Sequence, residues 1–149
     1  MNRLPPYRLH QSLGYQLSVT SRIQERRLDE GLKKLGLTRI SWCILLAVGN
    51  EALTQPSDIA EFVGIDRTAT SRALRQMEAA GLVSRQNGTA DRRTTRVGLT
   101  AKGRQRLDEG TPLAIANNRV MAARLTPDEH RELERLLAKA RGGDAMQGL

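Results

Sequence analysis

Apolar residues recur every three or four positions over much of this chain, as they do in α-helices that bury one face. The first such stretch, about residues 8–35, predicts one long helix with a leucine stripe, and Gly36 is a suitable end for it. Thr38 is a suitable N-cap for a second helix, at about 39–49. This second helix is apolar on nearly all sides, so we expect it to be buried.

Two shorter helices are predicted next. Thr54 can cap the first of them, with Pro56 in its first turn. Asp66 can cap the second, which runs from Arg67 to about Ala80. The side chains expected to face inward are Ile59, Ala60, Phe62 and Val63 in the first helix and Ala69, Ala73, Leu74 and Met77 in the second.

The remainder of the chain predicts a hairpin and two more helices. Residues 82–85 and 94–99 have strand character and flank a polar turn. Thr100 can begin a helix at about 101–123, in which Pro112 predicts a kink or a break. The sequence Thr-Pro-Asp-Glu from Thr126 forms a capping box for the last helix. The residues expected on the buried faces of these helices are Leu107, Leu113, Ile115 and Val120, then Leu133, Leu136 and Leu137.

Helix, glycine-containing turn, helix and hairpin, in this order, are typical of a winged helix-turn-helix. We therefore predict a mainly α fold with a small β-hairpin wing, as a single domain over residues 1–149. The winged helix-turn-helix lobe is expected to span about residues 37–100. The helices on either side of it carry leucine stripes wider than one small lobe needs.

Composition fits one domain and excludes several classes of protein. A chain of 149 residues can bury a cooperative core without disulfides or metal. The only cysteine, Cys43, cannot form an internal disulfide, and one Cys with two His cannot complete a structural zinc site, so no metal or cofactor is expected. No apolar run reaches the roughly 20 residues of a membrane span, and no secretory signal begins the chain, so a cytoplasmic location is expected.

The positive charge is concentrated in the middle of the chain. The formal net charge is +8, with 24 Lys and Arg against 16 Asp and Glu. The whole excess lies between Arg67 and Arg106, because acidic and basic residues cancel elsewhere. Such a basic surface suits a polyanion, and nucleic acid is the usual one. A solvated basic face kept for solubility is the alternative.

The second helix of a helix-turn-helix enters the major groove of DNA. Here its outward side chains are arginines and small hydroxyls, and no acid lies between Asp66 and Glu78. Arginine can bind guanine edges, and hydroxyls can bind phosphates or bases. The predicted DNA contacts on this helix are Arg67, Thr68, Thr70, Ser71, Arg72 and Arg75.

The hairpin loop is the second predicted contact. Arg92, Arg93 and Arg96 cluster on its returning side, where an arginine can enter the narrow minor groove. Asp91 is expected to support the loop, through backbone N–H groups or a neighbouring arginine. The alternative for these arginines is a solvated turn.

Two segments resemble the MarR family of bacterial regulators. Residues 58–85, DIAEFVGIDRTATSRALRQMEAAGLVSR, are similar to that family's helix-turn-helix. Residues 91–103, DRRTTRVGLTAKG, match its wing pattern of Asp-x-Arg followed by Leu-Thr-x-x-Gly. The resemblance maps the wing arginine to Arg93 and its supporting acid to Asp91.

The resemblance also implies an assembly and a function. It implies a homodimer in which the first helix and the last two, about 8–36 and 101–141, interlock, so that two lobes bind a pseudo-palindromic operator in double-stranded DNA. We predict a sequence-specific transcriptional regulator, acting as a repressor that a small ligand relieves, because many members of the family release DNA on binding a small aromatic or phenolic acid. The candidate ligand contacts are His10, Tyr15 and Trp42. The alternative is a surface or interface role for His10 and Tyr15 and a core position for Trp42.

A repressor relieved by a small ligand has three alternatives. A non-specific architectural protein would bind DNA without sequence preference. A thiol-based redox sensor would use Cys43, but this residue lies in the second helix, whereas peroxide sensors of the family carry theirs in the first. An enzyme is not expected, because the sequence has no glycine-rich phosphate loop, no His-Glu-x-x-His motif and no nucleophile elbow.

Overall fold

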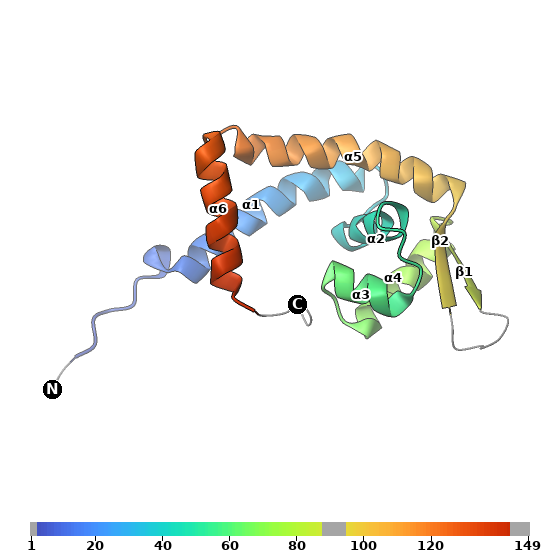
Figure 1. Ribbon diagram of the computed structural model, residues 1–149, viewed down its shortest axis with the longest axis horizontal. Helices are drawn as coiled ribbons and strands as arrows, with labels where there is room; N and C mark the ends of the chain where they lie inside the picture. The colour runs from blue at the N-terminus through green and yellow to red at the C-terminus, as the bar shows by residue number, and fades with distance from the viewer. Residues whose placement is uncertain (1–2, 88–94, 144–149) are drawn as a thin grey trace.

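A lobe of three short helices and a hairpin lies at one end of the molecule, and two long helices extend from it toward a last helix (Figure 1). The structure, a computed structural model, describes residues 3–87 and 95–143. In chain order the elements are η1 (Leu9–Gln11), α1 (Leu13–Lys33), α2 (Arg39–Gly49), α3 (Pro56–Val63), α4 (Arg67–Ala79), β1 (Val83–Asn87), β2 (Thr95–Leu99), α5 (Ala101–Ala122) and α6 (Pro127–Arg141).

The first predicted helix is divided in two. Ser12 has an extended backbone, with φ −72° and ψ 130°, and it separates the short 3₁₀ helix η1 from α1. The Ser12 hydroxyl accepts a hydrogen bond from the backbone N–H of Tyr15 at 3.2 Å, which caps α1. A serine before a leucine-rich stretch is a local start signal that the long apolar periodicity obscured.

The second helix forms as predicted and lies in the core. The Thr38 hydroxyl accepts from the Ser41 backbone N–H at 3.1 Å, and the Ser41 hydroxyl accepts from the Thr38 N–H at 2.8 Å. This reciprocal capping box begins α2 at Arg39. Trp42, Ile44, Leu45 and Ala47 are buried, which confirms the expectation for an apolar helix.

The start of α3 differs from the prediction. Gln55, not Thr54, is the N-cap residue, and its side chain makes no capping bond. The Thr54 carbonyl instead accepts a hydrogen bond from the Val97 N–H at 2.8 Å, so this residue lies beside the hairpin. The prediction for Phe62 is also wrong, because its side chain is 44% exposed although Ile59 is fully buried.

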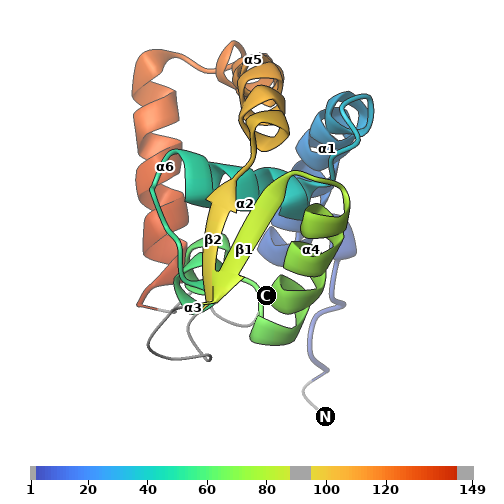
Figure 2. The ribbon, with the colours of Figure 1, turned by 90° about the vertical axis from the view of Figure 1, so that its right-hand side faces the viewer.

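The predicted hairpin is present and packs against the lobe (Figure 2). Gly81, with φ +75°, ends α4 in the left-handed conformation that glycine adopts most easily. The strands β1 and β2 then pair antiparallel, from Val83 opposite Leu99 to Asn87 opposite Thr95. Val83 and Val97 are buried, which anchors one face of the hairpin in the lobe core.

The helix α5 runs without a break through Pro112. Its start is capped as predicted, because the Thr100 hydroxyl accepts from the Gly103 N–H at 3.0 Å. Leu107 is buried, but the predictions for Ile115 and Val120 are wrong, since these side chains are 46% and 36% exposed. The periodicity identified the helix correctly and assigned these two side chains to the wrong environment.

Two glycines allow α5 to approach the lobe closely. A Cβ atom on Gly110 would overlap the ring of Trp42, and a Cβ atom on Gly103 would overlap the backbone carbonyl of Leu82. Neither position therefore has room for a side chain. The long helix is fixed to the lobe by contacts that only glycine permits.

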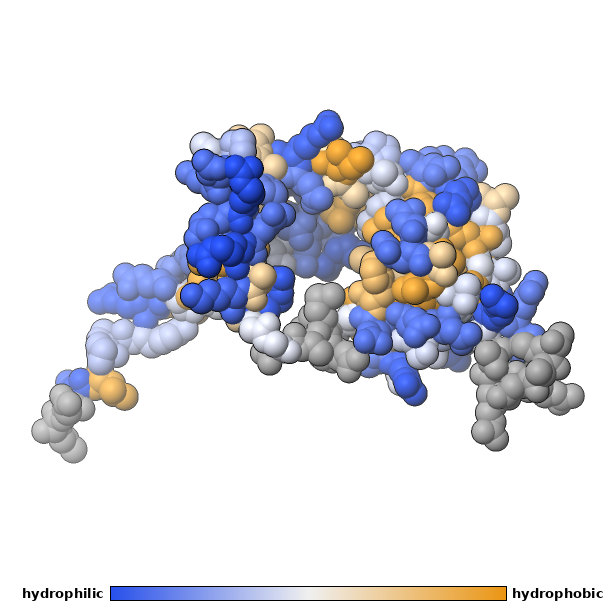
Figure 3. Space-filling model, in the orientation of Figure 1, coloured by the Kyte–Doolittle hydropathy of each residue, from blue (hydrophilic) through white to orange (hydrophobic). Residues whose placement is uncertain are grey.

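The helices outside the lobe leave apolar side chains uncovered. The capping box at Thr126 begins α6 as predicted, yet no described residue of α6 is buried, and Leu133 and Leu136 are 40% and 46% exposed. In Figure 3 apolar side chains gather over the lobe, while the visible face of α6 is mainly polar. The leucines of α6 therefore have no core of their own within the described part of the chain.

Replacing Gly110 with alanine should destabilise the protein by about 1–3 kcal/mol, the usual cost of overpacking a core, because the new methyl group would displace Trp42. Thermal unfolding followed by circular dichroism measures the change. Gly14→Ala is the matched control, since only Ser12 Oγ lies within 4 Å of the added Cβ, at 3.9 Å. Equal midpoints for the two variants would contradict the packing argument.

Candidate nucleic-acid interface

The helix α4 presents a polar, basic face to solvent. Asp66 begins the helix, because its carboxylate accepts a hydrogen bond from the Ala69 N–H at 2.7 Å. Leu74 and Met77 are buried against the lobe, which turns the opposite side outward. The predicted contact residues that the structure exposes on this side are Arg67, Thr68, Ser71, Arg72 and Arg75.

Thr70 does not belong to this exposed set. Its side chain is 1% exposed, and its hydroxyl donates a hydrogen bond to the Asp66 carbonyl at 2.8 Å. The structure therefore does not present Thr70 on the exposed face of α4, and its contact with DNA stays a prediction. Its spacing of three, four and seven residues from the buried Ala73, Leu74 and Met77 was the sequence signal that places it inside.

A shallow pocket of about 250 Å³ lies beside the start of α4. Arg67, Thr70 and Ser71 line it from α4, Pro56 and Ser57 from α3, Thr95 from β2, and Gln55 from the residue before α3. Hydroxyl groups and an arginine beside a helix N-terminus suit a phosphate. The sequence interpretation did not single out Ser57 or Thr95, since only the tertiary fold brings three elements together here.

The base of the wing is described, but its tip is not. Arg96 lies on β2 opposite Gln86 and is exposed. The predicted loop residues Asp91, Arg92 and Arg93 lie outside the described residues. Of the three predicted wing arginines, the described residues therefore include Arg96, which lies on β2 at the base of the wing.

Several cations of the basic segment serve the protein's own structure. The Arg85 guanidinium donates two hydrogen bonds to the Glu78 carboxylate, at 3.1 and 3.2 Å. Lys102 donates to the Ala80 carbonyl at 2.8 Å and so satisfies the C-terminal end of α4. Arg106 pairs with a glutamate one turn along α5.

The other cations of the segment face solvent. These cations are Arg67, Arg72, Arg75, Arg96 and Arg104. Within residues 3–87 and 95–143, none of these five side chains makes an ion pair of 4 Å or less. The charge available to a polyanion is thus concentrated on α4, β2 and the start of α5.

The end of α4 and the start of α5 are joined by further hydrogen bonds. The Thr100 hydroxyl lies 2.6 Å from the Gly81 carbonyl and 3.1 Å from the Leu82 carbonyl. Because Thr100 also caps α5, one side chain links α4, the hairpin and α5. These contacts fix the position of α4 relative to the long helix.

The three candidate ligand residues are not brought together. Trp42 is 4% exposed in the lobe core, which agrees with its alternative as a core residue. His10 and Tyr15 form an edge-to-face pair with ring centroids 5.0 Å apart, at the end of α1 remote from α2 (Figure 1). A single pocket lined by all three is therefore not present in the described chain.

Cys43 is half-buried on α2. Burial raises the pKa of the Cys43 thiol, because apolar surroundings disfavour the charged thiolate. The positive charge of Arg39, one turn earlier in α2, opposes this shift.

Two negative findings apply to residues 3–87 and 95–143. Their His, Cys, Asp and Glu side chains nowhere gather in groups of three or more that could hold a metal ion. None of their helices has the length and apolar character needed to cross a membrane.

A helix-turn-helix followed by a two-stranded wing defines the chain as a winged-helix DNA-binding protein. A sequence model of the MarR family matches residues 35–94. Over these residues the chain matches the MarR family, whose members are DNA-binding transcriptional regulators and not enzymes.

Solved structures agree with this assignment. A mutant of MarR from E. coli, in complex with operator DNA, is 26% identical, with a TM-score of 0.79 over 86% of this chain and 92% of that one. BpsR from Bordetella bronchiseptica is 23% identical, with a TM-score of 0.84 over 94% of this chain and 100% of that one. MepR from S. aureus, in complex with DNA, is 20% identical, with a TM-score of 0.78 over 88% and 95%.

Removing the charge of Glu78 should loosen the wing. The hydrogen bonds from Arg85 hold the pKa of the Glu78 carboxyl below its usual value, so the pair is intact at neutral pH. Glu78→Gln should therefore make amide hydrogen exchange in β1 several-fold faster. In the unmodified protein the contribution of the pair should be lost as the pH falls through the lowered pKa.

Glu132→Gln is the matched control, because Arg135 likewise lowers the pKa of Glu132, but on α6, away from the hairpin. This control should leave exchange in β1 unchanged. Unchanged exchange in the Glu78 variant would show that the pair does not hold the wing.

Proposed function

We propose that this chain is a homodimeric repressor that binds a pseudo-palindromic operator and is released from it by a small ligand. The observation that carries the proposal is the exposed face of α4, on which arginines and hydroxyls stand without an acid between Asp66 and Glu78. Such a face suits both phosphates and base edges in the major groove. MarR, solved with operator DNA, and MepR, solved with DNA, share the fold that positions this face.

The contacts assigned to DNA are those that remain accessible. On α4 they are Arg67, Thr68, Ser71, Arg72 and Arg75. From the wing we assign Arg96 together with Arg92 and Arg93, and Asp91 as the support of the loop, on the sequence pattern alone. The lobe of about residues 37–100 would thus read DNA through one helix and one loop.

The assignment of a homodimer rests on the uncovered apolar side chains outside the lobe. Leu13 and Leu17 on α1 and Leu133 and Leu136 on α6 are between 40% and 70% exposed. A second copy would cover them, with about 8–36 and 101–141 as the dimerisation segments. Two lobes in such a dimer would reach half-sites about 34–36 Å apart, close to one turn of DNA.

The assignment of a releasing ligand rests on a relative. In BpsR, 6-hydroxynicotinic acid regulates DNA binding. By analogy with BpsR, we propose that this chain binds a small aromatic ligand. The binding site would not contain His10, Tyr15 and Trp42 together. The ligand would act by favouring a separation of the two lobes that does not fit the operator.

Selection of bound sequences from a random DNA library tests the proposal. An inverted repeat with half-sites one helical turn apart is the expected result. Affinity should fall by about 10³–10⁵ between 50 and 200 mM salt if six to ten phosphates are neutralised. Retention without sequence preference would favour an architectural protein, and no retention would contradict DNA binding.

Arg72→Ala and Arg75→Ala should each weaken binding to the selected operator by about 1–3 kcal/mol, the range for losing an arginine contact to a base. Fluorescence anisotropy with a labelled operator measures the loss, and circular dichroism checks the fold. Arg131→Ala removes the same charge from α6, where the side chain is paired with Asp128, and should bind like the unmodified protein. Unchanged affinity in both α4 variants would remove this helix from the proposal.

Cys43→Ser tests the redox alternative. Because burial raises the pKa of the thiol, little reactive thiolate is present at neutral pH, and peroxide should not change DNA affinity in either the unmodified protein or the variant. The same anisotropy assay with and without hydrogen peroxide measures this. A peroxide response that the serine variant lacks would favour redox sensing through Cys43.

A further inference from the structure

The apolar stripe of α6 has no partner within the described chain. Leu133 and Leu136 are 40% and 46% exposed, and no other helix or strand of residues 3–87 and 95–143 makes an extended contact with α6. A helix of 15 residues is only marginally stable alone in water, because packing supplies most of the stability of a helix in a protein. The helix α6 therefore requires a surface on which these leucines can pack.

The N-terminal segment, residues 3–8, is a second uncovered apolar surface. Leu4 and Tyr7 are 91% and 81% exposed, and the segment extends away from the rest of the molecule (Figure 1). Pro5 and Pro6 favour an extended, polyproline-type backbone, because a proline fixes its own φ and restricts the residue before it. A polyproline helix has three residues per turn, so Leu4 and Tyr7 share one side of it. A backbone that is already extended loses little entropy when it docks on another surface.

The two surfaces carry opposite charges. The N-terminal segment contains Arg3 and Arg8, and no acidic residue occurs in residues 1–24. The first half of α6 is acidic, and Glu132 and Glu134 lie on either side of the leucine stripe. Their side chains are 53% and 69% exposed, so both carboxylates are accessible to a cation from another chain. The charges therefore favour a contact between the segment and this helix.

The two surfaces agree in length but lie apart within one chain. Six residues of polyproline backbone span roughly 19 Å, and the 15 residues of α6 span about 22 Å. Both surfaces lie at the end of the molecule remote from the lobe in Figure 1, but Figure 2 shows them on opposite sides of the molecule. A two-fold axis at this end would bring the segment of each copy to α6 of the other.

We propose that residues 3–8 of each copy dock on α6 of the other copy, with Leu4 and Tyr7 on the leucine stripe and an arginine beside Glu134. The inference rests on the proposed homodimer, and it adds a segment that precedes the helices assigned to the dimer above. Burial of the apolar side chains supplies the free energy of the contact, and the opposite charges select the partner surface.

Exchanging the charges tests whether the two surfaces meet between copies. One variant carries Arg3→Glu with Arg8→Glu, and the other carries Glu132→Arg with Glu134→Arg, both in the full chain. Each variant alone should raise the dimer dissociation constant, measured by sedimentation, by about 5- to 50-fold, because like charges would then face each other. An equimolar mixture should recover the constant of the unmodified chain, because a mixed dimer has opposite charges at both contacts.

The apolar part of the contact has its own test. Leu4→Ser combined with Tyr7→Ser should raise the same dissociation constant by about 10-fold or more, because the docked segment would bury less apolar surface. Phe62→Ser is the matched control, since it removes a side chain that is 44% exposed on α3 of the lobe, and it should leave the constant unchanged.

The possible results separate the inference from its premise. If the unmodified chain is monomeric at micromolar concentration, the proposed dimer itself fails. If the chain is a dimer and neither charge variant changes its constant, the copies meet elsewhere and the inference alone is overturned. Weakening that the mixture does not reverse would also overturn it, because the contact would then lie within one chain. Glu132 also pairs with Arg135 in α6, so Glu134→Arg alone replaces the double variant if circular dichroism shows lost helix.

Discussion

The position of α4, the helix we propose to face DNA, depends on two close contacts, in which α5 lies directly on the backbone and on the tryptophan of the lobe. Gly103 meets the Leu82 carbonyl, and Gly110 meets the Trp42 ring, so neither position accepts a side chain. Leu82 directly follows the turn that ends α4. Because backbone and an aromatic ring make these contacts, α5 is held close to the lobe with little room for either to shift alone.

The distribution of charge follows from this arrangement. Some cations of the basic segment are used inside the protein: Arg85 holds the hairpin to α4, and Lys102 satisfies the end of α4. Others, such as Arg72 and Arg75, are exposed and have no acidic partner among the described residues. A basic segment in the sequence is therefore a mixture of structural and available cations, and only the fold separates them.

The sequence predicted what neighbouring residues determine. The caps at Thr38, Asp66 and Thr126 and the left-handed Gly81 rest on contacts within a few residues, and these helix boundaries were correct to within a residue or two. The failures involve distant partners. Thr54 bonds to the hairpin, and the charge of Arg85 is committed to Glu78, neither of which periodicity can reveal. Most of the exposed face of α4 was predictable, because in a helix the buried positions recur every three or four residues.

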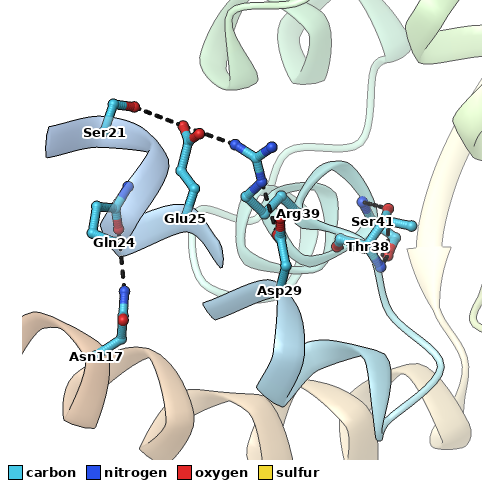
Figure 4. Close-up of polar contacts among 8 residues, drawn as sticks. All are labelled: Ser21, Gln24, Glu25, Asp29, Thr38, Arg39, Ser41 and Asn117. Atoms are coloured by element: carbon cyan, nitrogen blue, oxygen red, sulfur yellow. Dashed lines mark hydrogen bonds and ion pairs between the residues drawn. The ribbon is translucent and has the colours of Figure 1, made fainter. Parts of the chain in front are cut away.

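Three residues of α1, within two turns of one another, bond to both α5 and the lobe. Gln24 bonds to Asn117 on α5, while Glu25 and Asp29 each bind the Arg39 guanidinium at 2.8 Å, at the start of α2 (Figure 4). Arg39 places a positive charge at a helix N-terminus, where the helix dipole disfavours it, so the two carboxylates offset an unfavourable position. A shift of α1 would change both sets of contacts together, since they lie within two turns of one rigid helix. The helices that would meet a second copy and the lobe that would meet DNA are therefore both bonded to α1.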